Sequence, residues 1–381
     1  MVENTSFLYS SYIIDGIAQP LTPAEMLKEC AAEGALTTPV PDSPADIADE
    51  TTDLSAEDFP FSLEALPSYS EAIAALPRRP FPVPFAAPYS CGKVAQALID
   101  AIWQGGHFRL GDLSLKAEWR WDDKAIGNMA AFYASVEAAC RFTDDLGLKF
   151  REVQVTQGQC AFTAKAATAL VEEDIPEDEV DEEDSIIREL PFRTSRPRMS
   201  RRRRCPSSLL PHPADWLVYI PFDSCSYRLG GSTLAAALNA RPAVAPDIGD
   251  ADYFLDGYEV VRELLEDGIV KAGATVFQGG LMTALQRMTT ECGAEIGIGS
   301  LCKAVEGASP VQVLFSEVPG VVVQIDDADY DYLDAELLLQ DVAYYPLGHP
   351  DPERPGVRVS GESSDISRIL ESLMNTLEGE D

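Results

Sequence analysis

The chain has few of the residues from which metal and redox sites are usually built. Its 381 residues include only three histidines, at positions 107, 212 and 349, without the spacing of a shared metal site. Eight cysteines are present, but no two of them form a Cys-x-x-Cys pair, so the sequence indicates neither a zinc site nor a redox motif. We therefore expect reduced, mostly buried thiols.

Long apolar runs and an excess of basic charge are also missing. No apolar stretch approaches the ~20 residues that span a bilayer, and residues 1–14 lack the basic region with which a secretory signal begins. Lysine and arginine total 29 against 63 acidic residues, and the resulting net charge of −34 repels nucleic acid. The sequence therefore favours a cytoplasmic protein that binds neither membranes nor nucleic acid.

Two segments lack the periodicity of packed structure. Residues 1–88 are rich in proline, alanine and acidic side chains, with short amphipathic pieces at 23–30 and 63–75. They predict either a poorly ordered region or an arm that packs on another part of the protein. Residues 171–213 join an acidic block to Arg201–Arg204, and they predict a charged, disordered insertion. A solvated loop neutralised by its acidic neighbours is the simpler explanation of the four arginines. A nucleic-acid or nuclear-import patch and a disturbed reading frame remain as alternatives.

Two other stretches, residues 89–170 and 214–349, show regular apolar spacing. The first contains helical spacing at 94–103 and 129–146 and strand alternation at 110–121. In the second, helices mix with short apolar runs that we expect to be strands, at 216–221, 274–277, 295–298, 311–314 and 321–325. The mixture predicts an α+β fold with an N-terminal α/β domain and a C-terminal α/β sandwich domain. Residues 350–381 predict an acidic tail with one helix at 366–377.

Paired glycines precede two of the expected helices. Gly230-Gly231 leads into a helix through Ser232, and Gly279-Gly280 opens another. Glycine lets backbone N–H groups approach a phosphate, and the helix N-terminus adds a favourable partial charge. The first turn therefore indicates an anion site or, alternatively, an ordinary N-cap in a close-packed turn.

Glu317 closes the segment Leu314-Phe-Ser-Glu317, which follows the two glycine turns in sequence. A carboxylate at a strand end can bind Mg²⁺ or a substrate amine. It can equally cap backbone N–H donors. The pattern alone leaves both interpretations open.

Three motifs follow one another in the chain: Arg228-Leu-Gly-Gly-Ser-Thr-Leu234, Gly279-Gly280-Leu281 and Phe315-Ser-Glu317, supported by Leu113-Ser-Leu-Lys-Ala-Glu-Trp-Arg-Trp121. In this order they resemble an aminoimidazole ribonucleotide synthetase-like domain, and in particular the second such unit of the large phosphoribosylformylglycinamidine (FGAM) synthases. The resemblance covers roughly residues 91–349, and the insertion at about 171–213 lies outside it. It implies a role in purine biosynthesis, in which ATP and Mg²⁺ activate the amide oxygen of formylglycinamide ribonucleotide and ammonia then displaces it.

The resemblance also implies particular site residues. It assigns nucleotide or phosphate binding to Arg228, Gly230, Gly231, Ser232, Gly279 and Gly280. It assigns metal binding to Glu317 and Glu118, and it identifies no catalytic residue. The chain departs from the family at Gln278, where an acidic residue is expected, and at Glu118, where an asparagine is expected.

The resemblance further implies partners, because neither a glutaminase nor a second synthetase-like unit is recognisable in the sequence. We expect a homodimer or another synthetase-like unit as the partner, with ammonia supplied by a glutaminase on another chain. The alternative function is that of a catalytically degenerate homologue, which binds a nucleotide or a partner protein as a structural component.

Overall fold

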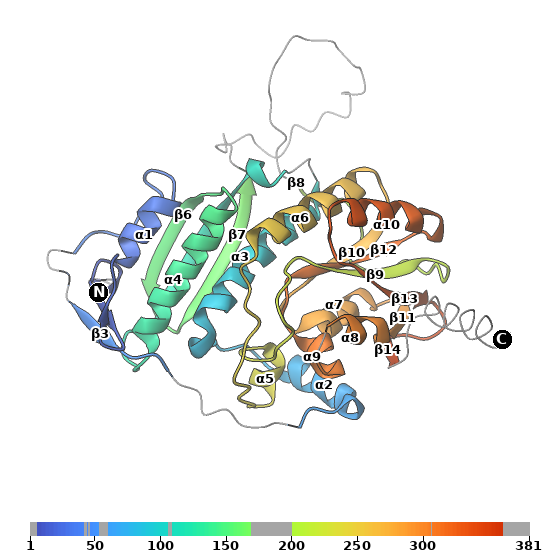
Figure 1. The fold of residues 1–381 in the computed structure, drawn as a ribbon, viewed down its shortest axis with the longest axis horizontal. Coiled ribbons are helices and arrows are strands. Elements are labelled where there is room, and N and C mark those ends of the chain that lie inside the picture. The colour runs from blue at the N-terminus through green and yellow to red at the C-terminus, as the bar shows by residue number, and fades with distance from the viewer. Residues whose placement is uncertain are drawn as a thin grey trace, which may run out of the picture.

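The structure is a computed structural model, and it describes residues 6–41, 44, 46–52, 60–105, 109–168, 200–305 and 307–360. These residues form four sheets, of which a three-stranded and a six-stranded sheet build the body of the molecule (Figure 1). The α+β class expected from the sequence is confirmed. No described helix is long and apolar enough to cross a lipid bilayer.

The first unit is a three-stranded sheet with two long helices packed on one face. Strand β5 (Leu113–Trp121) lies between the parallel strand β6 (Phe150–Gln157) and the antiparallel strand β7 (Ala161–Thr168). The helices are α3 (Ala86–Ile102) and α4 (Asn128–Asp145). Trp119 is buried and donates from Nε1 to Ser135 Oγ of α4, 2.9 Å away. Because side chains alternate along a strand, Glu118 lies on the opposite, exposed face.

The N-terminal residues pack on this unit, as in the packed-arm alternative and not as a poorly ordered region. They form η1 (Ser6–Leu8), β1 (Tyr12–Ile14), β2 (Ile17–Ala18), α1 (Pro23–Cys30) and β3 (Ile47–Asp49). Helix α1 packs against α4, and it begins with a capping box between Thr22 and Glu25. Phe7 and Leu27 are almost completely buried. The amphipathic pieces expected at 23–30 and 63–75 are α1 and, further along the chain, a 3₁₀ turn with the helix that follows it.

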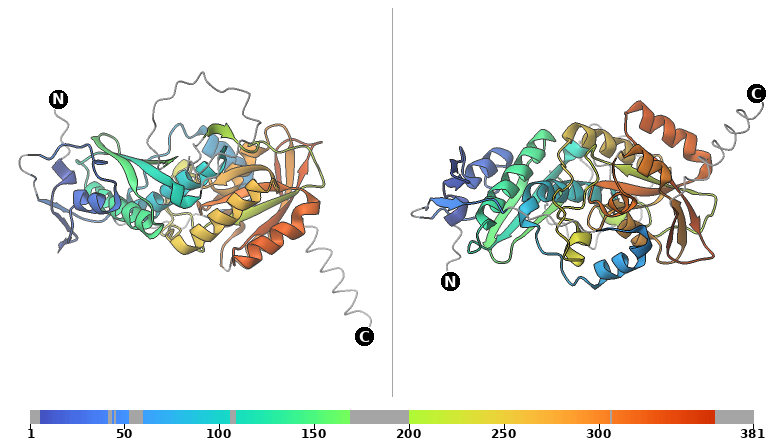
Figure 2. Two further views of the ribbon diagram at one scale, coloured as in Figure 1. Left: turned by 90° about the horizontal axis from the view of Figure 1, so that it is seen from above. Right: turned by 60° about the horizontal axis from the view of Figure 1, so that its bottom comes forward.

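Residues 60–85 then cross to the second unit and return. They contain η2 (Leu63–Ala65), α2 (Leu66–Ala75) and η3 (Val83–Phe85). Helix α2 lies beside α5 (Thr233–Ala237), well away from the other N-terminal elements (Figures 1 and 2). Tyr69 of α2 packs edge-to-face on Phe315, with ring centroids 6.0 Å apart. We call residues 76–85, which lead from α2 back to α3, the strap.

The second unit is a six-stranded sheet in the order β10-β12-β9-β13-β11-β14. Its strands are β9 (Trp216–Pro221), β10 (Val270–Val276), β11 (Gly293–Gly297), β12 (Gly320–Ile325), β13 (Tyr345–Asp351) and β14 (Val357–Ser360). Neighbouring strands are antiparallel, except that β11 and β14 are parallel.

Helices cover both faces of this sheet (Figure 1). One face carries α6 (Ala251–Glu266) and α10 (Tyr330–Leu339), and the other carries α7 (Gly280–Met288), α8 (Gly299–Ala304) and α9 (Pro310–Phe315). Along β9, Val218 and Ile220 belong to the core on the α6 face, whereas Leu217 and Tyr219 belong to the core on the other. A strand buried on both faces needs apolar residues throughout, which explains the unbroken apolar run of β9.

The two units share one core. Phe142 of α4 packs edge-to-face on Phe254 of α6, with centroids 5.7 Å apart, and the buried cluster on this side is continuous between the units. Helix α3 contacts both sheets, through β7 and β10. The two units that the sequence separated at residues 171–213 therefore pack directly on each other.

Some expected elements differ in the structure. The expected strand at 311–314 is wrong, because these residues lie in α9, which begins with a capping box between Ser309 and Gln312. Within the predicted insertion, β8 (Ser200–Arg203) pairs with β4 (Gln104–Gly105), whereas residues 169–199 lie outside the described residues. Past residue 350 the sheet continues into β14, and the helix expected at 366–377 lies outside the described residues.

Candidate functional site

The two glycine turns meet at the carboxylate of Glu317. This residue lies between α9 and β12, and it is only 4 % exposed. Its Oε1 accepts hydrogen bonds from Thr233 N at 2.8 Å, Thr233 Oγ1 at 2.6 Å and Gly279 N at 2.8 Å. One side chain therefore ties the beginning of α5 to the beginning of α7. In these turns, which the resemblance assigned to a phosphate, the backbone donors of Thr233 and Gly279 bind a carboxylate of the protein itself.

Close packing of the backbone explains why glycines stand in these turns. A Cβ atom on Gly230 would lie 2.4 Å from the carbonyl carbon of Val244, where the chain crosses itself. Gly280 has a φ of +70°, and a Cβ atom there would lie 2.6 Å from the carbonyl oxygen of Leu314. Ser232 is the N-cap of α5, and its hydroxyl accepts from Ala235 N at 3.1 Å. The geometry matches the N-cap interpretation of this turn.

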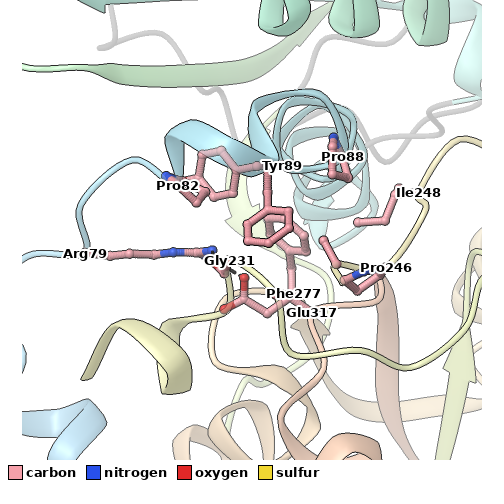
Figure 3. A pocket seen from close by; sticks show the side chains of 12 residues that line it. Arg79, Pro82, Pro88, Tyr89, Gly231, Pro246, Ile248, Phe277 and Glu317 are labelled. Carbon is pink, nitrogen blue, oxygen red and sulfur yellow. Dashed lines mark hydrogen bonds and ion pairs between the residues drawn. The ribbon is translucent and has the colours of Figure 1, made fainter. Parts of the chain in front are cut away.

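Arg79 of the strap provides the positive charge that faces Glu317. Its Nη1 lies 2.6 Å from Glu317 Oε2, and the side chains of the two residues are only 9 % and 6 % exposed. Its Nη2 donates to the carbonyl oxygen of Gly231. The guanidinium carbon also lies 4.6 Å from the centroid of the Tyr89 ring, so the cation packs on an aromatic face (Figure 3). Arg79 is thus fixed by an ion pair, a carbonyl and a ring.

A small pocket opens beside this ion pair. Its empty space is ≈ 260 Å³ including its open mouth. Its walls are mainly apolar and are formed by Pro82, Phe85, Pro88, Pro246, Ile248 and Phe277 (Figure 3). Tyr89 completes the wall and accepts a hydrogen bond from Gln278 Nε2 at 3.2 Å. Burial raises the pKa of Tyr89 despite the opposing effect of nearby Arg79, which favours the neutral phenol.

The residues present do not fit a resident Mg²⁺ ion. Oε1 of Glu317 already accepts three hydrogen bonds, and a cation at Oε2 would have to displace the Arg79 guanidinium. Glu118 is exposed on the outer face of β5, so it does not share a site with the buried Glu317. Within the described ranges, no group of three or more histidine, cysteine or acidic side chains is placed to hold a metal ion.

The structure therefore brings together most of the residues that the sequence singled out. Gly230, Gly231, Ser232, Gly279, Gly280 and Glu317 lie around one junction. Arg228 is adjacent, and its backbone N–H and carbonyl both bond to Ser316 Oγ, at 3.0 and 2.9 Å. Its half-buried side chain makes no hydrogen bond or ion pair with another described residue. Glu118 is the member of the set that lies elsewhere.

Arg79 and Tyr89 are the site residues that the sequence did not identify. The prolines around Arg79 exclude a regular helix or central strand, and they leave open whether the segment packs. A sequence signal for packing was present, because Phe81 and Phe85 lie among and directly after these prolines, and disordered segments contain few aromatic residues. In the structure, Phe81 packs edge-to-face on Trp121, with centroids 4.7 Å apart.

Comparison with curated proteins finds FGAM synthases. The human phosphoribosylformylglycinamidine synthase is 28 % identical over 115 residues, which are 30 % of this chain and 8 % of the relative. The probable chloroplastic/mitochondrial enzyme of Arabidopsis thaliana is 29 % identical over 133 residues, 35 % of this chain and 9 % of the relative. The Drosophila melanogaster enzyme is 30 % identical over 151 residues, 35 % of this chain and 10 % of the relative. Each match thus spans a tenth of the relative or less.

No protein-family model matches the chain. Among solved structures, Thermotoga maritima PurL complexed with FGAR has 11 % identity and a TM-score of 0.49, covering 77 % of this chain and 42 % of that one. The hydrogenase maturation protein HypE of E. coli has 14 % identity and a TM-score of 0.46, covering 89 % and 92 %. Neither likeness is close enough to transfer a ligand or an activity. Over about a third of its length, this chain is thus similar to curated FGAM synthases.

Proposed function

We propose that this chain is a non-catalytic FGAM synthase-like protein, which serves as a structural or partner-binding component. The observation that carries the proposal is the ion pair between Arg79 and Glu317 at the junction of the two glycine turns. In this arrangement the backbone donors of the turns bind the Glu317 carboxylate, and that carboxylate binds the Arg79 guanidinium. The protein's own side chains thus take the places of a bound anion and a bound cation. The junction then stabilises the fold and does not bind Mg²⁺ and a nucleotide.

The energetics of buried charge support this proposal. A Mg²⁺ ion at Glu317 would leave the Arg79 guanidinium without its partner in a buried position. Breaking a buried ion pair by removing one partner costs about 3–5 kcal/mol. A phosphate at the same turns would compete with the Glu317 carboxylate for the N–H groups of Thr233 and Gly279. Nucleotide binding would therefore have to offset both losses.

A ligase function is the second candidate, and the sequence matches to FGAM synthases favour it. In this case the chain would take part in ATP- and Mg²⁺-dependent amidine formation on formylglycinamide ribonucleotide. It would act together with a second synthetase-like unit and a glutaminase on another chain. The strap would have to move so that Arg79 left Glu317 before a metal could bind.

Calorimetric titration with ATP and with ADP, each with and without Mg²⁺, separates the two candidates. We expect no magnesium-dependent binding to the full chain, because Glu317 and its neighbouring N–H donors are already paired. A full-length FGAM synthase titrated in the same buffers verifies that the assay detects nucleotide. Magnesium-dependent binding to this chain that Glu317→Gln abolishes would overturn the proposal and support the ligase function.

The structural role implies a partner, either a second copy of this chain or another synthetase-like unit. The outer face of the β5–β6–β7 sheet is open to such a partner, since Glu118, Gln154, Thr163 and Lys165 are all exposed there. Native mass spectrometry and sedimentation velocity of the full chain test for self-association. We expect Glu118→Arg to weaken the assembly, whereas Glu71→Arg, at an exposed position on α2, leaves it unchanged. A monomer under all conditions would argue against self-association through this face.

A further inference from the structure

Two cysteine sulfurs lie in contact where the N-terminal helix α1 packs on the first unit. The Sγ atoms of Cys30 and Cys140 lie 2.6 Å apart, although 110 residues separate them in sequence. Non-bonded heavy atoms usually pack about 3.5–4.0 Å apart, and a disulfide bond is about 2.05 Å long. The separation is thus closer to a bond than to an ordinary contact. Among the described residues, no other two cysteine sulfurs form such a contact.

The elements that carry these cysteines place them for a cross-link. Cys30 is the last residue of α1, and Cys140 lies in the buried face of α4, against which α1 packs. Both residues are buried, at 2 % and 6 % exposure. The chain leaves α1 through Ala31, which forms a bridge with Phe150 at the start of β6. Cys30 is therefore held on both sides, and its sulfur faces Cys140 in the folded state.

We propose that Cys30 and Cys140 form a reversible disulfide that fastens α1 to α4 under oxidising conditions. The bond closes a long loop, and a cross-link between residues far apart in sequence restricts the unfolded chain strongly. The oxidised protein holds its N-terminal segment covalently, whereas the reduced protein holds it by packing alone. The stability of the first unit, together with the N-terminal segment packed on it, then depends on the surrounding thiol–disulfide balance.

The reaction is a thiol–disulfide exchange with a small-molecule disulfide such as oxidised glutathione. One cysteine thiolate attacks a glutathione sulfur, forms a mixed disulfide and releases one reduced glutathione. The second cysteine thiolate attacks the protein-bound sulfur of the mixed disulfide, forms the Cys30–Cys140 bond and releases a second reduced glutathione. The two thiol protons pass to the two glutathione thiolates, and two electrons pass from the cysteines to the oxidant.

Burial governs the rate of this reaction. The contact with the Cys30 thiol and burial raise the pKa of Cys140, so little thiolate is present there at neutral pH. The exchange therefore requires local opening of α1 from α4. We expect oxidation over hours at neutral pH, and faster oxidation as the pH rises.

Peptide mapping of the full chain tests the cross-link directly. The protein is equilibrated in a glutathione buffer, either oxidised or reduced, then alkylated and digested with trypsin without reduction. Cleavage isolates Cys30 in the peptide of residues 29–78 and Cys140 in that of residues 125–141, and neither peptide contains another cysteine. The proposal expects the two peptides joined, with a mass two hydrogens below their sum, in the oxidised sample only. Both peptides alkylated after oxidation would overturn it.

Thermal unfolding provides an independent measurement. We expect the melting temperature of the oxidised protein to exceed that of the reduced protein by several degrees, and Cys140→Ala to abolish this difference. Cys91→Ala is the matched control, because Cys91 is equally buried in α3 and makes no contact with a cysteine, so the redox difference is retained. The same redox difference in Cys140→Ala as in the unchanged chain would contradict the assignment.

Discussion

Arg79 Nη1 lies 2.6 Å from Glu317 Oε2, in a position where both side chains are more than nine-tenths buried. One residue comes from the proline-rich strap and the other from the short connection between α9 and β12 in the second unit. A buried ion pair is costly to break from one side, because the remaining charge keeps its desolvation cost and loses its partner. The strap is thereby coupled to both glycine turns.

This coupling can be measured with a double-mutant cycle. We expect Glu317→Gln and Arg79→Met each to lower the free energy of unfolding by about 3–5 kcal/mol. The double variant should lose less than the sum of the two, because it leaves no unpaired buried charge. Urea unfolding of the four proteins provides the values. Strict additivity would show that the two side chains do not stabilise each other.

Gly230 should not tolerate a side chain. The added Cβ of Gly230→Ala would lie 2.4 Å from the carbonyl carbon of Val244, so the crossing chains would have to separate. We expect a loss of about 1–3 kcal/mol in the free energy of unfolding. Gly249→Ala is the control, since a Cβ there meets no atom within 4 Å and the φ of Gly249 is not positive. Equal effects of the two substitutions would refute the crowding argument.

Asp49 is expected to stabilise the beginning of α4. Its carboxylate accepts hydrogen bonds from Gly127 N at 2.9 Å, Met129 N at 2.8 Å and Ala130 N at 3.0 Å. N–H groups at the beginning of a helix have no acceptor within the helix. We expect Asp49→Ala to cost about 1–2 kcal/mol in the free energy of unfolding. Asp144→Ala, at a side chain that is 69 % exposed, should change it little. Chemical denaturation of both variants checks the difference.

Lys93 should make stability depend on pH. Burial lowers the pKa of its ammonium group below the ordinary 10.5, although the Asp100 carboxylate opposes the change. Between the two values the unfolded chain binds a proton that the folded chain has released, so stability rises with pH in the window below 10.5. Lys93→Met should remove this rise and should be more stable than the unchanged chain at neutral pH.

The control for this prediction is Lys149→Met, because the Lys149 side chain is 50 % exposed. Unfolding free energies of both variants are measured from pH 7 to pH 10. If the unfolding free energy of Lys93→Met rises with pH as steeply as that of the unchanged chain, other groups cause the pH dependence.

The sequence predicted the elements whose apolar spacing was long and regular. Helix α4, expected at 129–146, is found at Asn128–Asp145, and the expected strand at 216–221 is β9. A short apolar run does not distinguish a strand from a buried helix. This ambiguity caused the error at 311–314, although the capping residues Ser309, Pro310 and Gln312 were visible in the sequence.

The sequence predicted the glycine turns and the carboxylate of the candidate site, but it did not predict the positive charge that pairs with that carboxylate. Gly230, Gly280 and Glu317 stand close together because the order of elements brings them together, and that order was recognisable. The partner of Glu317 was not, because Arg79 lies in a segment without periodicity and reaches the site only through tertiary packing. Sequence spacing contains no information about such a contact. The same reason hid the proximity of Cys30 and Cys140.

The packing of Tyr69 on Phe315 has a consequence for how the chain acquires its fold. Helix α2, near the N-terminus, contributes Tyr69 to the core of the second unit. This part of the core therefore cannot form until Phe315 has been synthesised. Contacts between residues so distant in sequence slow folding, because a long loop must be ordered first. During synthesis, the apolar face of α2 stays exposed until the second unit has been made. A shortened chain that begins at α3 would lack the helix that covers this part of the second unit.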